Sequence, residues 1–430
     1  MNPTLPIAII GAGPVGLAAA AHLTERKQPF VVLESGGTVA SAIESWQHVK
    51  LFSTWQYNLD RAAQRLLESQ DEAGNVQWER PRATQLPTGR ELIDAYLAPL
   101  AAHPAIAPHL RVRHRVTAIT RASITGGSFD KTRTTDREAK PFLVRFTAPN
   151  GEGELLARAV IDATGTWHSP NPVGRSGIPA VGEAAAREQA TVTAPIPDPL
   201  GAERARFAGK RILVLGSGHS AATTLIALGR LRQREPSTEI LWGIRGIAGA
   251  NRLFGGGAAD ELPARGQLGV SLRRLVDSGA ATLLEGVSVT ALTVEAGSAP
   301  HPLTVGLADG RTLQVDLLVP ATGFRPDHSI TSELRLALDH PTEAPSALGS
   351  LIAPEFHSCG TVPAHGAAAL AHPDSDFYTV GAKSYGRAPT FLLATGYEQV
   401  RSVAAELSGD SEAARAVHLS LPQTGVCSAG

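Results

Sequence analysis

The 430-residue sequence contains only two cysteines, Cys359 and Cys427, and neither stands in a C-x-x-C pair. This scarcity excludes a disulfide-stapled secreted protein and fits a reducing cytoplasm. The sequence also lacks any apolar run long enough to cross a bilayer, and its first residues lack a basic segment followed by a long apolar one. We therefore expect a cytoplasmic protein without a membrane span or a signal peptide.

An excess of either charge is missing as well, since the formal net charge is −1. No surface that would attract nucleic acid or an anionic membrane is expected from this balance. The histidines are scattered without metal-ligand spacing, so no metal site is predicted. With 43% hydrophobic residues the composition is that of a globular protein, and the length predicts two or three domains.

A glycine-rich turn near the start gives the first functional signal. The apolar run 7–10 leads into G-x-G-x-x-G at Gly11, Gly13 and Gly16, and a helix and the strand 30–33 follow. In this setting the glycines allow a tight turn and close approach of the backbone to a pyrophosphate, and the acid after the second strand, Glu34, accepts hydrogen bonds from a ribose. The alternative is a glycine turn without a ligand, which leaves the position of Glu34 unexplained.

A second turn of this type begins after the apolar run 211–215. Gly216-Ser217-Gly218-His219-Ser220-Ala221 is G-x-G-x-x-A, and the strand 239–244 behind it ends on a basic residue, Arg245. An arginine suits the 2′-phosphate of NADP, because a guanidinium binds phosphate oxygens in pairs. The alternative is an exposed arginine without a ligand.

Each glycine turn is followed later by an apolar run that ends in Ala-Thr-Gly. We expect a buried strand over 155–167 that ends at Thr164 and Gly165, and one over 313–319 that is followed by Thr322 and Gly323. This recurrence favours two nucleotide-binding halves over a chance repeat of a tripeptide. The sequence also predicts a strand over 110–119, and a helix over 90–101 with Thr88 as its N-cap.

These elements predict an α/β fold of two Rossmann-like dinucleotide-binding domains, with an NADP domain inserted in an FAD domain. FAD at the first turn and NADPH at the second is the simplest assignment for two dinucleotides that exchange a hydride. The expected boundaries are 1–170 for the first FAD-domain segment, 171–208 for a crossover, 209–319 for the NADP domain and 320–430 for the second FAD-domain segment.

The chain resembles the flavoproteins with two dinucleotide-binding domains, which include the flavin-containing monooxygenases and the thioredoxin-reductase-like enzymes. The resemblance rests on GAGPVG with Glu34, DATGTW, GSGHSA with Arg245, PATGFRPD and YTVGAKSYGRAPTF. It implies FAD contacts at Gly11, Gly13, Pro14, Gly16, Glu34, Val116, Thr164, Gly165 and Gly381. It implies NADPH contacts at Gly216, Ser217, Gly218, Ser220, Arg245, Thr322 and Gly323.

Three functions remain open at this point. The first is a monooxygenase that oxidises a small soft nucleophile with dioxygen through a flavin hydroperoxide. The family's F-x-G-x-x-x-H motif is absent, which speaks against its Baeyer–Villiger and N-hydroxylating groups. The second is a reductase that passes electrons to a small acceptor or through Cys359 and Cys427, and the third is a flavoprotein that senses nicotinamide without catalysis. The sequence leaves the oligomeric state open, a homodimer included.

The catalytic candidates come from two segments. The loop before the last helix contributes Lys383, Tyr385 and Arg387, and an aromatic-rich segment contributes Ser53 and Trp55. Each has groups that hydrogen-bond or flank a flavin or a polar substrate. The alternative for each is a packing or surface role.

Overall fold

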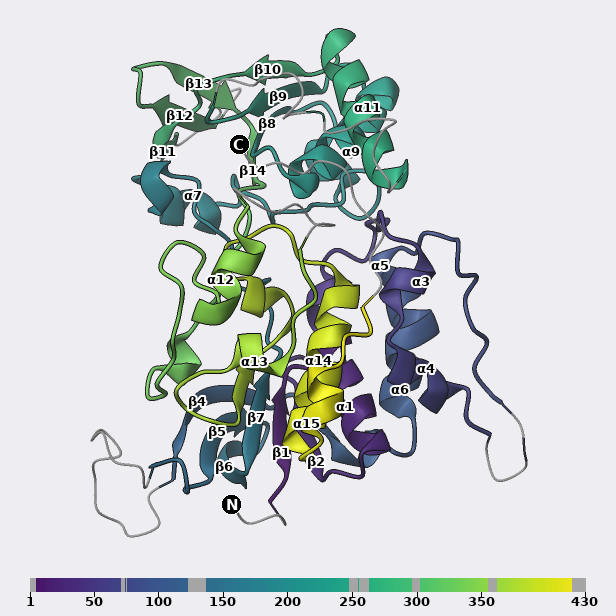
Figure 1. Cartoon of the computed structure of the whole chain (residues 1–430). Helices are drawn as coiled ribbons and strands as arrows, with labels where there is room; N and C mark the ends of the chain where they lie inside the picture. The colour runs from purple at the N-terminus through teal and green to yellow at the C-terminus, as the bar shows by residue number, and fades with distance from the viewer. Residues whose placement is uncertain are drawn as a thin grey trace. The chain divides into compact units, whose positions relative to one another are not determined.

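The computed structural model describes residues 5–70, 74, 76–122, 137–246, 254, 263–295, 302–354 and 362–419. The chain forms two compact units, which we call unit 1 (up to His168 and again from Pro326) and unit 2 (Ser169–Arg325). Within these described ranges no helix is long and apolar enough to span a membrane. In Figure 1 unit 1 consists of the purple to blue first part of the chain and the light green to yellow last part, and unit 2 is the teal to green part between them.

A five-stranded parallel sheet forms the centre of unit 1. Its strand order is β15-β7-β1-β2-β3. The bounds are β1 Ile7–Ile10, β2 Phe30–Leu33, β3 Leu110–Arg111, β7 Ala159–Asp162 and β15 Phe377–Thr379. Because β15 pairs with β7, the last part of the chain returns to the sheet that the first part begins.

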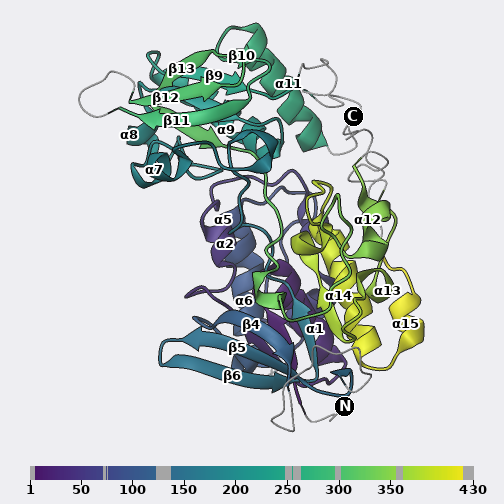
Figure 2. The same ribbon diagram turned by 90° about the vertical axis from the view of Figure 1, so that its left-hand side faces the viewer.

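Both faces of this sheet are covered, as its continuous apolar strands require. Ile7 and Ile9 pack against the helices, whereas Ala8 and Ile10 face an antiparallel sheet. That second sheet has the order β4-β5-β6, and Figure 2 shows it across the lower part of unit 1. Its strands are β4 Arg115–Arg121, β5 Phe142–Ala148 and β6 Gly151–Ala157. Unit 1 is therefore a three-layer structure of helices, parallel sheet and antiparallel sheet.

Helices α1 and α14 pack side by side on the helical face of unit 1 (Figure 1). The α-helices of this unit are α1 Pro14–Glu25, α2 Ser41–Glu44, α3 Trp55–Asn58, α4 Arg61–Leu67, α5 Gly89–Leu92, α6 Ala98–Ala102, α12 Ser346–Ile352, α13 Ala367–Leu370, α14 Leu393–Leu407 and α15 Ser411–Arg415. Short 3₁₀ segments cover Ala107–His109, Ser329–Thr331 and Gly381–Tyr385.

Unit 2 repeats the same three layers. A parallel sheet of order β10-β9-β8-β14 packs against α9 and α11 on one face and against the antiparallel sheet β11-β12-β13 on the other. The strands are β8 Arg211–Leu215, β9 Glu239–Gly243, β10 Thr282–Leu284, β11 Val289–Val294, β12 Leu303–Leu307, β13 Thr312–Val315 and β14 Leu317–Pro320. The helices are α7 Glu183–Glu188, α8 Arg204–Phe207, α9 His219–Arg234 and α11 Pro263–Asp277, with a 3₁₀ segment at Arg175–Gly177.

The two ends of unit 2 lie together. The Arg325 N–H donates to the Ser169 carbonyl oxygen at 3.0 Å, and Pro170 forms an antiparallel bridge with Phe324. The chain therefore enters and leaves unit 2 at neighbouring points.

Three expected elements differ from the structure. The predicted strand 110–119 is two strands in different sheets, β3 and β4. The predicted strand 155–167 divides into β6 and β7 at Arg158, and the predicted strand 313–319 divides into β13 and β14 at Asp316. In each of the last two cases the chain passes from an antiparallel sheet into a parallel one at a single charged residue, Arg158 or Asp316, which stands between two strands.

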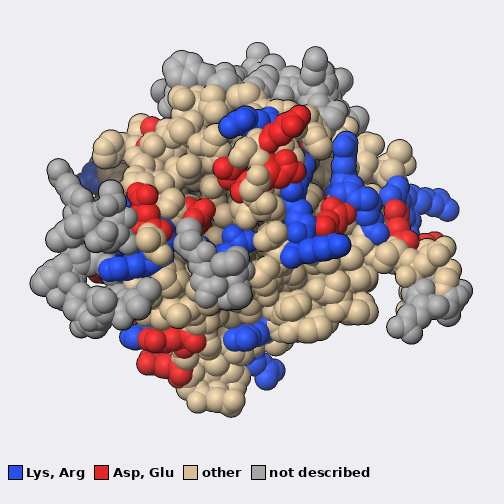
Figure 3. Space-filling model, turned by 60° about the horizontal axis from the view of Figure 1, so that its bottom comes forward, with Lys and Arg blue, Asp and Glu red and all other residues tan. Residues whose placement is uncertain are grey.

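The helix over 90–101 exists but is not uniform. Thr88 caps α5 in a reciprocal capping box with Glu91, as predicted, and a π-helical turn at Ile93–Leu97 separates α5 from α6. On the face of the molecule in Figure 3, positive and negative side chains are interspersed, in keeping with the balanced charge of the sequence.

Candidate functional site

The first glycine turn has a geometry that only small residues allow. Gly11 has a φ of +99°, and a β-carbon there would lie 2.8 Å from the Ala163 carbonyl oxygen. A β-carbon at Gly16 would lie 2.0 Å from the Gly11 carbonyl oxygen. These two glycines therefore bring β1, the start of α1 and the end of β7 into direct backbone contact.

Gly13 is different, because a β-carbon there would meet no atom within 4 Å. Gly13 is the N-cap of α1, it has no side-chain cap, and Pro14 follows it in the first turn. The first N–H groups of a helix have no partners within the helix and attract anions. Open space above Gly13 at this helix end fits the predicted pyrophosphate.

Glu34 follows β2 and is buried beside the same turn. Its Oε1 accepts hydrogen bonds from the Gly36 N–H at 2.6 Å and the Ser41 hydroxyl at 3.1 Å, and its Oε2 accepts one from the Ala12 N–H at 2.7 Å. A carboxylate oxygen accepts about two hydrogen bonds, so Oε2 keeps capacity for a ribose hydroxyl. Its contacts hold the carboxylate rigidly at the place where the sequence predicts a ribose.

The second glycine turn repeats the first. Gly216 has a φ of +129°, and a β-carbon there would lie 2.0 Å from the Ala321 carbonyl oxygen. Gly218 is the N-cap of α9, without a side-chain cap, and a β-carbon there would meet nothing within 4 Å. Ser217 is exposed and Ser220 is half-buried in the first turn of α9. Two sites of the same construction therefore exist, one in each unit.

Arg245 is the basic residue expected to bind the 2′-phosphate at the second turn. It lies two residues after the end of β9, and its side chain is exposed. By strand register Leu33 corresponds to Gly243, so Glu34 aligns with Ile244, and Arg245 lies one residue further along the chain. Glu34 is held by its neighbours, whereas the Arg245 guanidinium is accessible to a ligand. The two glycine turns thus have residues of opposite charge close behind their second strands.

Each Ala-Thr-Gly segment follows a parallel strand and lies against one of the two glycine turns. Gly165 and Gly323 both have positive φ, +68° and +83°. Thr164 donates its hydroxyl to Asp162 Oδ1 at 2.7 Å, and Thr322 donates to the Asn171 carbonyl oxygen at 2.7 Å. In each unit the alanine carbonyl abuts the first glycine of the turn, which explains why the tripeptide recurs.

The segment that follows β15 packs against the start of α1. A β-carbon at Gly381, whose φ is +68°, would lie 3.3 Å from the Val15 side chain. The fully buried Gln399 of α14 accepts a hydrogen bond from the Gly381 N–H at 2.8 Å and donates to the Ser384 hydroxyl at 2.8 Å. The predicted contact residue Gly381 therefore lies next to the helix end at which the pyrophosphate is expected.

Lys383 makes a buried ion pair. Its ammonium lies 2.6 Å from Asp162 Oδ2 and 3.2 Å from the Thr164 hydroxyl, and its side chain is 1% exposed. The pair joins the segment after β15 to the end of β7. Lys383 therefore contacts Asp162 and Thr164 at the end of β7.

The other catalytic candidates are spread over unit 1. Tyr385 is buried and contacts the Phe391 ring edge-on at 5.3 Å between centroids. Arg387 is exposed, 3.9 Å from Glu343. Val116, the predicted adenine contact, is buried in β4. The structure therefore brings Lys383 to the strand ends and places Arg387 at the surface.

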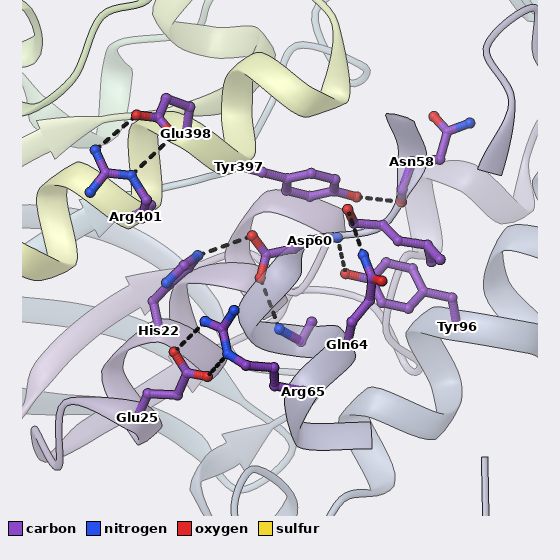
Figure 4. Close-up of polar contacts among 12 residues, drawn as sticks. His22, Glu25, Asn58, Asp60, Gln64, Arg65, Tyr96, Tyr397, Glu398 and Arg401 are labelled. Atoms are coloured by element: carbon purple, nitrogen blue, oxygen red, sulfur yellow. Dashed lines mark hydrogen bonds and ion pairs between the residues drawn. The ribbon is translucent and has the colours of Figure 1, made fainter. Parts of the chain in front are cut away.

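Ser53 and Trp55 belong to a segment held by partly or fully buried hydrogen bonds. Ser53 donates to Asn58 Oδ1 at 3.0 Å, and the Asn58 amide donates to the Ser53 and Thr54 carbonyl oxygens. Tyr397 of α14 donates to the Asn58 carbonyl oxygen at 2.9 Å (Figure 4). Segment 53–58 is thereby attached to α14.

The polar network continues toward α1. The Asp60 N–H donates to the Tyr96 hydroxyl at 3.1 Å, and the Asp60 carboxylate lies 3.0 Å from His22 Nε2 in α1 (Figure 4). Burial raises the pKa of Tyr96 and of Tyr397 well above the ordinary value for tyrosine, so both remain protonated donors. The network connects the helix of the first glycine turn with segment 53–58.

Sequence reasoning did not single out Asp162, Gln399, Asn58 or Tyr397. Asp162 had a visible signal, because an acid inside the apolar run 155–163 needs a buried partner. Gln399 and Tyr397 sit in an amphipathic helix, where a polar residue on the buried face is not distinguishable from one on the exposed face without knowing the packing. Cys359 and Cys427 lie outside the described residues, and among the described ones no group of His, Cys, Asp or Glu is arranged to hold a metal.

Comparison with known proteins gives one family match. Residues 9–77 match the model of an NAD(P)-binding Rossmann-like domain, which covers the first glycine turn, Glu34 and segment 53–58. No curated protein matches the chain in sequence.

Solved structures match over almost the whole chain. The bacillithiol disulfide reductase from Bacillus cereus has a TM-score of 0.64 at 18% identity, over 94% of this chain and 99% of that one. The FAD-bound cadaverine monooxygenase of desferrioxamine biosynthesis from Erwinia amylovora has a TM-score of 0.62 at 15% identity, over 98% and 97%. The ornithine N-hydroxylase from Kutzneria sp. 744 has a TM-score of 0.57 at 17% identity, over 96% and 100%. The predicted architecture is thus confirmed, and the chain has the fold of the flavoproteins with two dinucleotide-binding domains.

Proposed function

We propose that this protein is an FAD-containing, NADPH-dependent oxidoreductase, and that it is a monooxygenase that oxidises a small soft nucleophile at nitrogen or sulfur with dioxygen. One observation carries the proposal. Each unit contains a glycine turn with open space above its helix N-terminus, and a residue of opposite charge follows the second strand in each, Glu34 in unit 1 and Arg245 in unit 2.

The first site suits FAD as a resident group. Gly13 and the N-terminus of α1 would hold the pyrophosphate, and Glu34 would hold the adenosine ribose. Bound flavin supplies two-electron chemistry and reaction with dioxygen. Gly381 and the buried pair of Lys383 with Asp162 would fix the strand ends that carry the cofactor.

The second site suits NADPH as the electron donor. Gly218 and the N-terminus of α9 would hold its pyrophosphate, and the accessible Arg245 would bind its 2′-phosphate. NADH lacks this phosphate, so a preference for NADPH over NADH is expected.

The test is a rapid-mixing experiment on the FAD-loaded protein. NADPH reduces the flavin without oxygen, and oxygenated buffer is then added while the flavin spectrum is followed. A long-lived near-ultraviolet absorbance band before the oxidised spectrum returns supports the monooxygenase. A direct return to the oxidised spectrum contradicts it, and no reduction by NADPH contradicts the oxidoreductase proposal as a whole.

A reductase is the second candidate, and the similarity to the Bacillus cereus bacillithiol disulfide reductase favours it. In that case electrons from NADPH would pass through the flavin to a small acceptor or to Cys359 and Cys427. Thiol titration after anaerobic reduction tests the cysteine route, because two new thiols per chain are expected only if these residues form a disulfide. Their replacement by serine would then abolish acceptor reduction.

A further inference from the structure

A chain of buried hydrogen bonds connects His365 with the turn at Gly381. His365 Nε2 lies 2.9 Å from the side-chain nitrogen of Gln399 in α14, and this nitrogen also donates to the Ser384 hydroxyl at 2.8 Å. The side-chain oxygen of Gln399 accepts a hydrogen bond from the Gly381 N–H at 2.8 Å, and Ser384 donates to the Gly381 carbonyl oxygen at 2.8 Å. All four residues are buried, so the chain lies in the interior of unit 1.

The backbone fixes the direction of these hydrogen bonds at both ends. The Pro363 carbonyl oxygen lies 3.0 Å from His365 Nδ1 and can only accept, so Nδ1 carries the proton and Nε2 is an acceptor. The Gly381 N–H can only donate, so the Gln399 oxygen must face it and the Gln399 NH2 group must face His365. The arrangement that satisfies every group therefore requires a neutral imidazole.

A protonated imidazole does not fit this chain of hydrogen bonds. Its Nε2–H would point at the Gln399 NH2 group, so two donors would face each other. Rotation of the Gln399 amide by half a turn would give the imidazole an acceptor, but the NH2 group would then face the Gly381 N–H. Protonation of His365 therefore has to disturb either its contact with Gln399 or the turn at Gly381.

The turn at Gly381 packs directly on the start of α1. Val15 lies against two glycines, because a β-carbon at Gly381 would approach its side chain to 3.3 Å and one at Gly396 of α14 to 2.7 Å. Val15 belongs to the first turn of α1, two residues after Gly13, where the pyrophosphate is expected. A displacement of Gly381 would therefore change the packing at this helix end.

The residues that follow His365 hold it beside α14. A β-carbon at Gly366 would lie 2.1 Å from the Ser402 hydroxyl oxygen, so position 366 has room only for glycine. The same hydroxyl accepts a hydrogen bond from the Ala367 N–H at 2.9 Å. In Figure 1 the helix that begins at Ala367, α13, lies next to α14. His365 is thereby kept within reach of Gln399.

The titratable side chains that face the imidazole are Tyr385 and Glu398. The Tyr385 ring centroid lies 5.6 Å from that of His365, and Glu398 forms an ion pair with Arg401 at 2.8 Å. Burial is the largest influence and lowers the pKa of His365 below its ordinary value of 6.5, although the hydrogen bond to Pro363 and the charge of Glu398 oppose it. His365 is therefore neutral near pH 7, as the hydrogen bonds require.

We propose that His365 is a positioning residue of the FAD site: its neutral form holds Gly381 against the start of α1 through Gln399, and its protonation weakens FAD binding. The inference rests on the assignment of FAD to the first glycine turn, and it adds a residue that acts through others. Because FAD and the proton then compete, FAD affinity should fall as the pH decreases through the pKa of His365.

The first experiment compares two substitutions in the full-length protein after removal of FAD. His365→Gln keeps an acceptor for the Gln399 amide but does not take up a proton, whereas His365→Leu removes the acceptor. Titration with FAD at pH 7.5 should give His365→Gln an affinity close to that of the wild type. The Kd of His365→Leu should be about tenfold higher, because a buried N–H loses its partner.

The same titration at pH 7.5 and pH 5.0 tests the role of protonation. The Kd of the wild type should rise about tenfold at the lower pH, and that of His365→Gln should change less than about twofold. His340→Gln replaces an exposed histidine of unit 1 and should behave as the wild type does. Circular dichroism at each pH verifies that the proteins are folded.

Unchanged FAD affinity in His365→Leu at pH 7.5 overturns the positioning role, and equal pH dependence of the wild type and His365→Gln overturns the effect of protonation. If His365→Leu does not fold, the comparison of the wild type with His365→Gln still decides. Failure of the wild type to bind FAD at pH 7.5 would contradict the proposed cofactor site itself, and this inference with it.

Discussion

The Ala163 carbonyl oxygen lies against Gly11 so closely that a β-carbon at residue 11 would approach it to 2.8 Å, and Ala321 stands in the same relationship to Gly216. By contrast, Gly13 faces open space. Gly11 is therefore required by the fold, whereas Gly13 is required only if a ligand lies above it.

The first prediction compares two glycine substitutions. Gly11→Ala should destabilise the protein without FAD by about 1–3 kcal/mol, because it combines a positive φ with a backbone clash. Gly13→Ala should leave that stability unchanged and weaken FAD binding. Thermal unfolding of the apoprotein and FAD titration measure both effects, and a destabilised Gly13→Ala apoprotein would contradict the open-space argument.

The second prediction concerns cofactor choice. Arg245→Ala should raise the KM for NADPH about 10- to 100-fold and leave the KM for NADH unchanged, because a charge-assisted phosphate contact contributes about 1.5–3 kcal/mol. Arg230→Ala removes another exposed arginine of unit 2 and serves as the control. Equal losses with both nucleotides would show that Arg245 does not recognise the 2′-phosphate.

The third prediction concerns the buried pair of Lys383 and Asp162. Lys383→Met should destabilise the protein by about 3–5 kcal/mol, because it leaves a buried carboxylate without its partner. The double variant Lys383→Met/Asp162→Asn should recover much of this loss, since no buried charge remains. Urea unfolding of the two variants tests the point, and equal stability of the single and double variants would contradict it.

The fourth prediction concerns the attachment of segment 53–58. Tyr397→Phe should cost about 1–3 kcal/mol, because the buried Asn58 carbonyl loses its donor. If the segment borders the reaction site, turnover should fall more than flavin reduction by NADPH. The conservative control is Tyr378→Phe, a buried tyrosine of β15 in the same unit. Normal turnover in Tyr397→Phe would show that the hydrogen bond from Tyr397 to Asn58 contributes only to stability.

The fifth prediction concerns pH. Burial lowers the pKa of His372 from its ordinary value of 6.5 to about 4. Between these values the unfolded chain binds a proton that the folded one does not, so stability falls as pH decreases from 6.5 toward 4, by up to about 1.4 kcal/mol per pH unit. His372→Gln should flatten this part of the urea stability profile, whereas His418→Gln at the exposed C-terminal side should not. Parallel profiles of wild type and His372→Gln would contradict the assignment.

The sequence was sufficient for the features that depend on local pattern. The glycine turns, the strands at 7–10 and 30–33, and the Thr88 cap follow from residue types at fixed spacings, and the structure has them. The recurrence of Ala-Thr-Gly also pointed to two similar halves, and each half has the same three layers.

The features that depend on tertiary packing could not be predicted from the local sequence pattern. Arg158 and Asp316 each separate two strands of different sheets, and a single charged residue in an apolar run does not by itself indicate that the chain changes sheets. The prediction that Lys383 contacts substrate or flavin could not include its buried partner Asp162, which lies 221 positions away in sequence. Contacts between residues so distant in sequence are set by the fold and leave no local pattern.

The hydrogen bond between Arg325 and Ser169 holds together the two ends of unit 2, so this unit is a continuous insertion that could be deleted or replaced as one segment. Since its two ends are adjacent, a short linker between His168 and Pro326 should be enough to join the two parts of unit 1 into one continuous chain. If unit 2 binds the electron donor as we propose, replacing this one contiguous segment by the corresponding unit of another protein of this fold should change the electron donor.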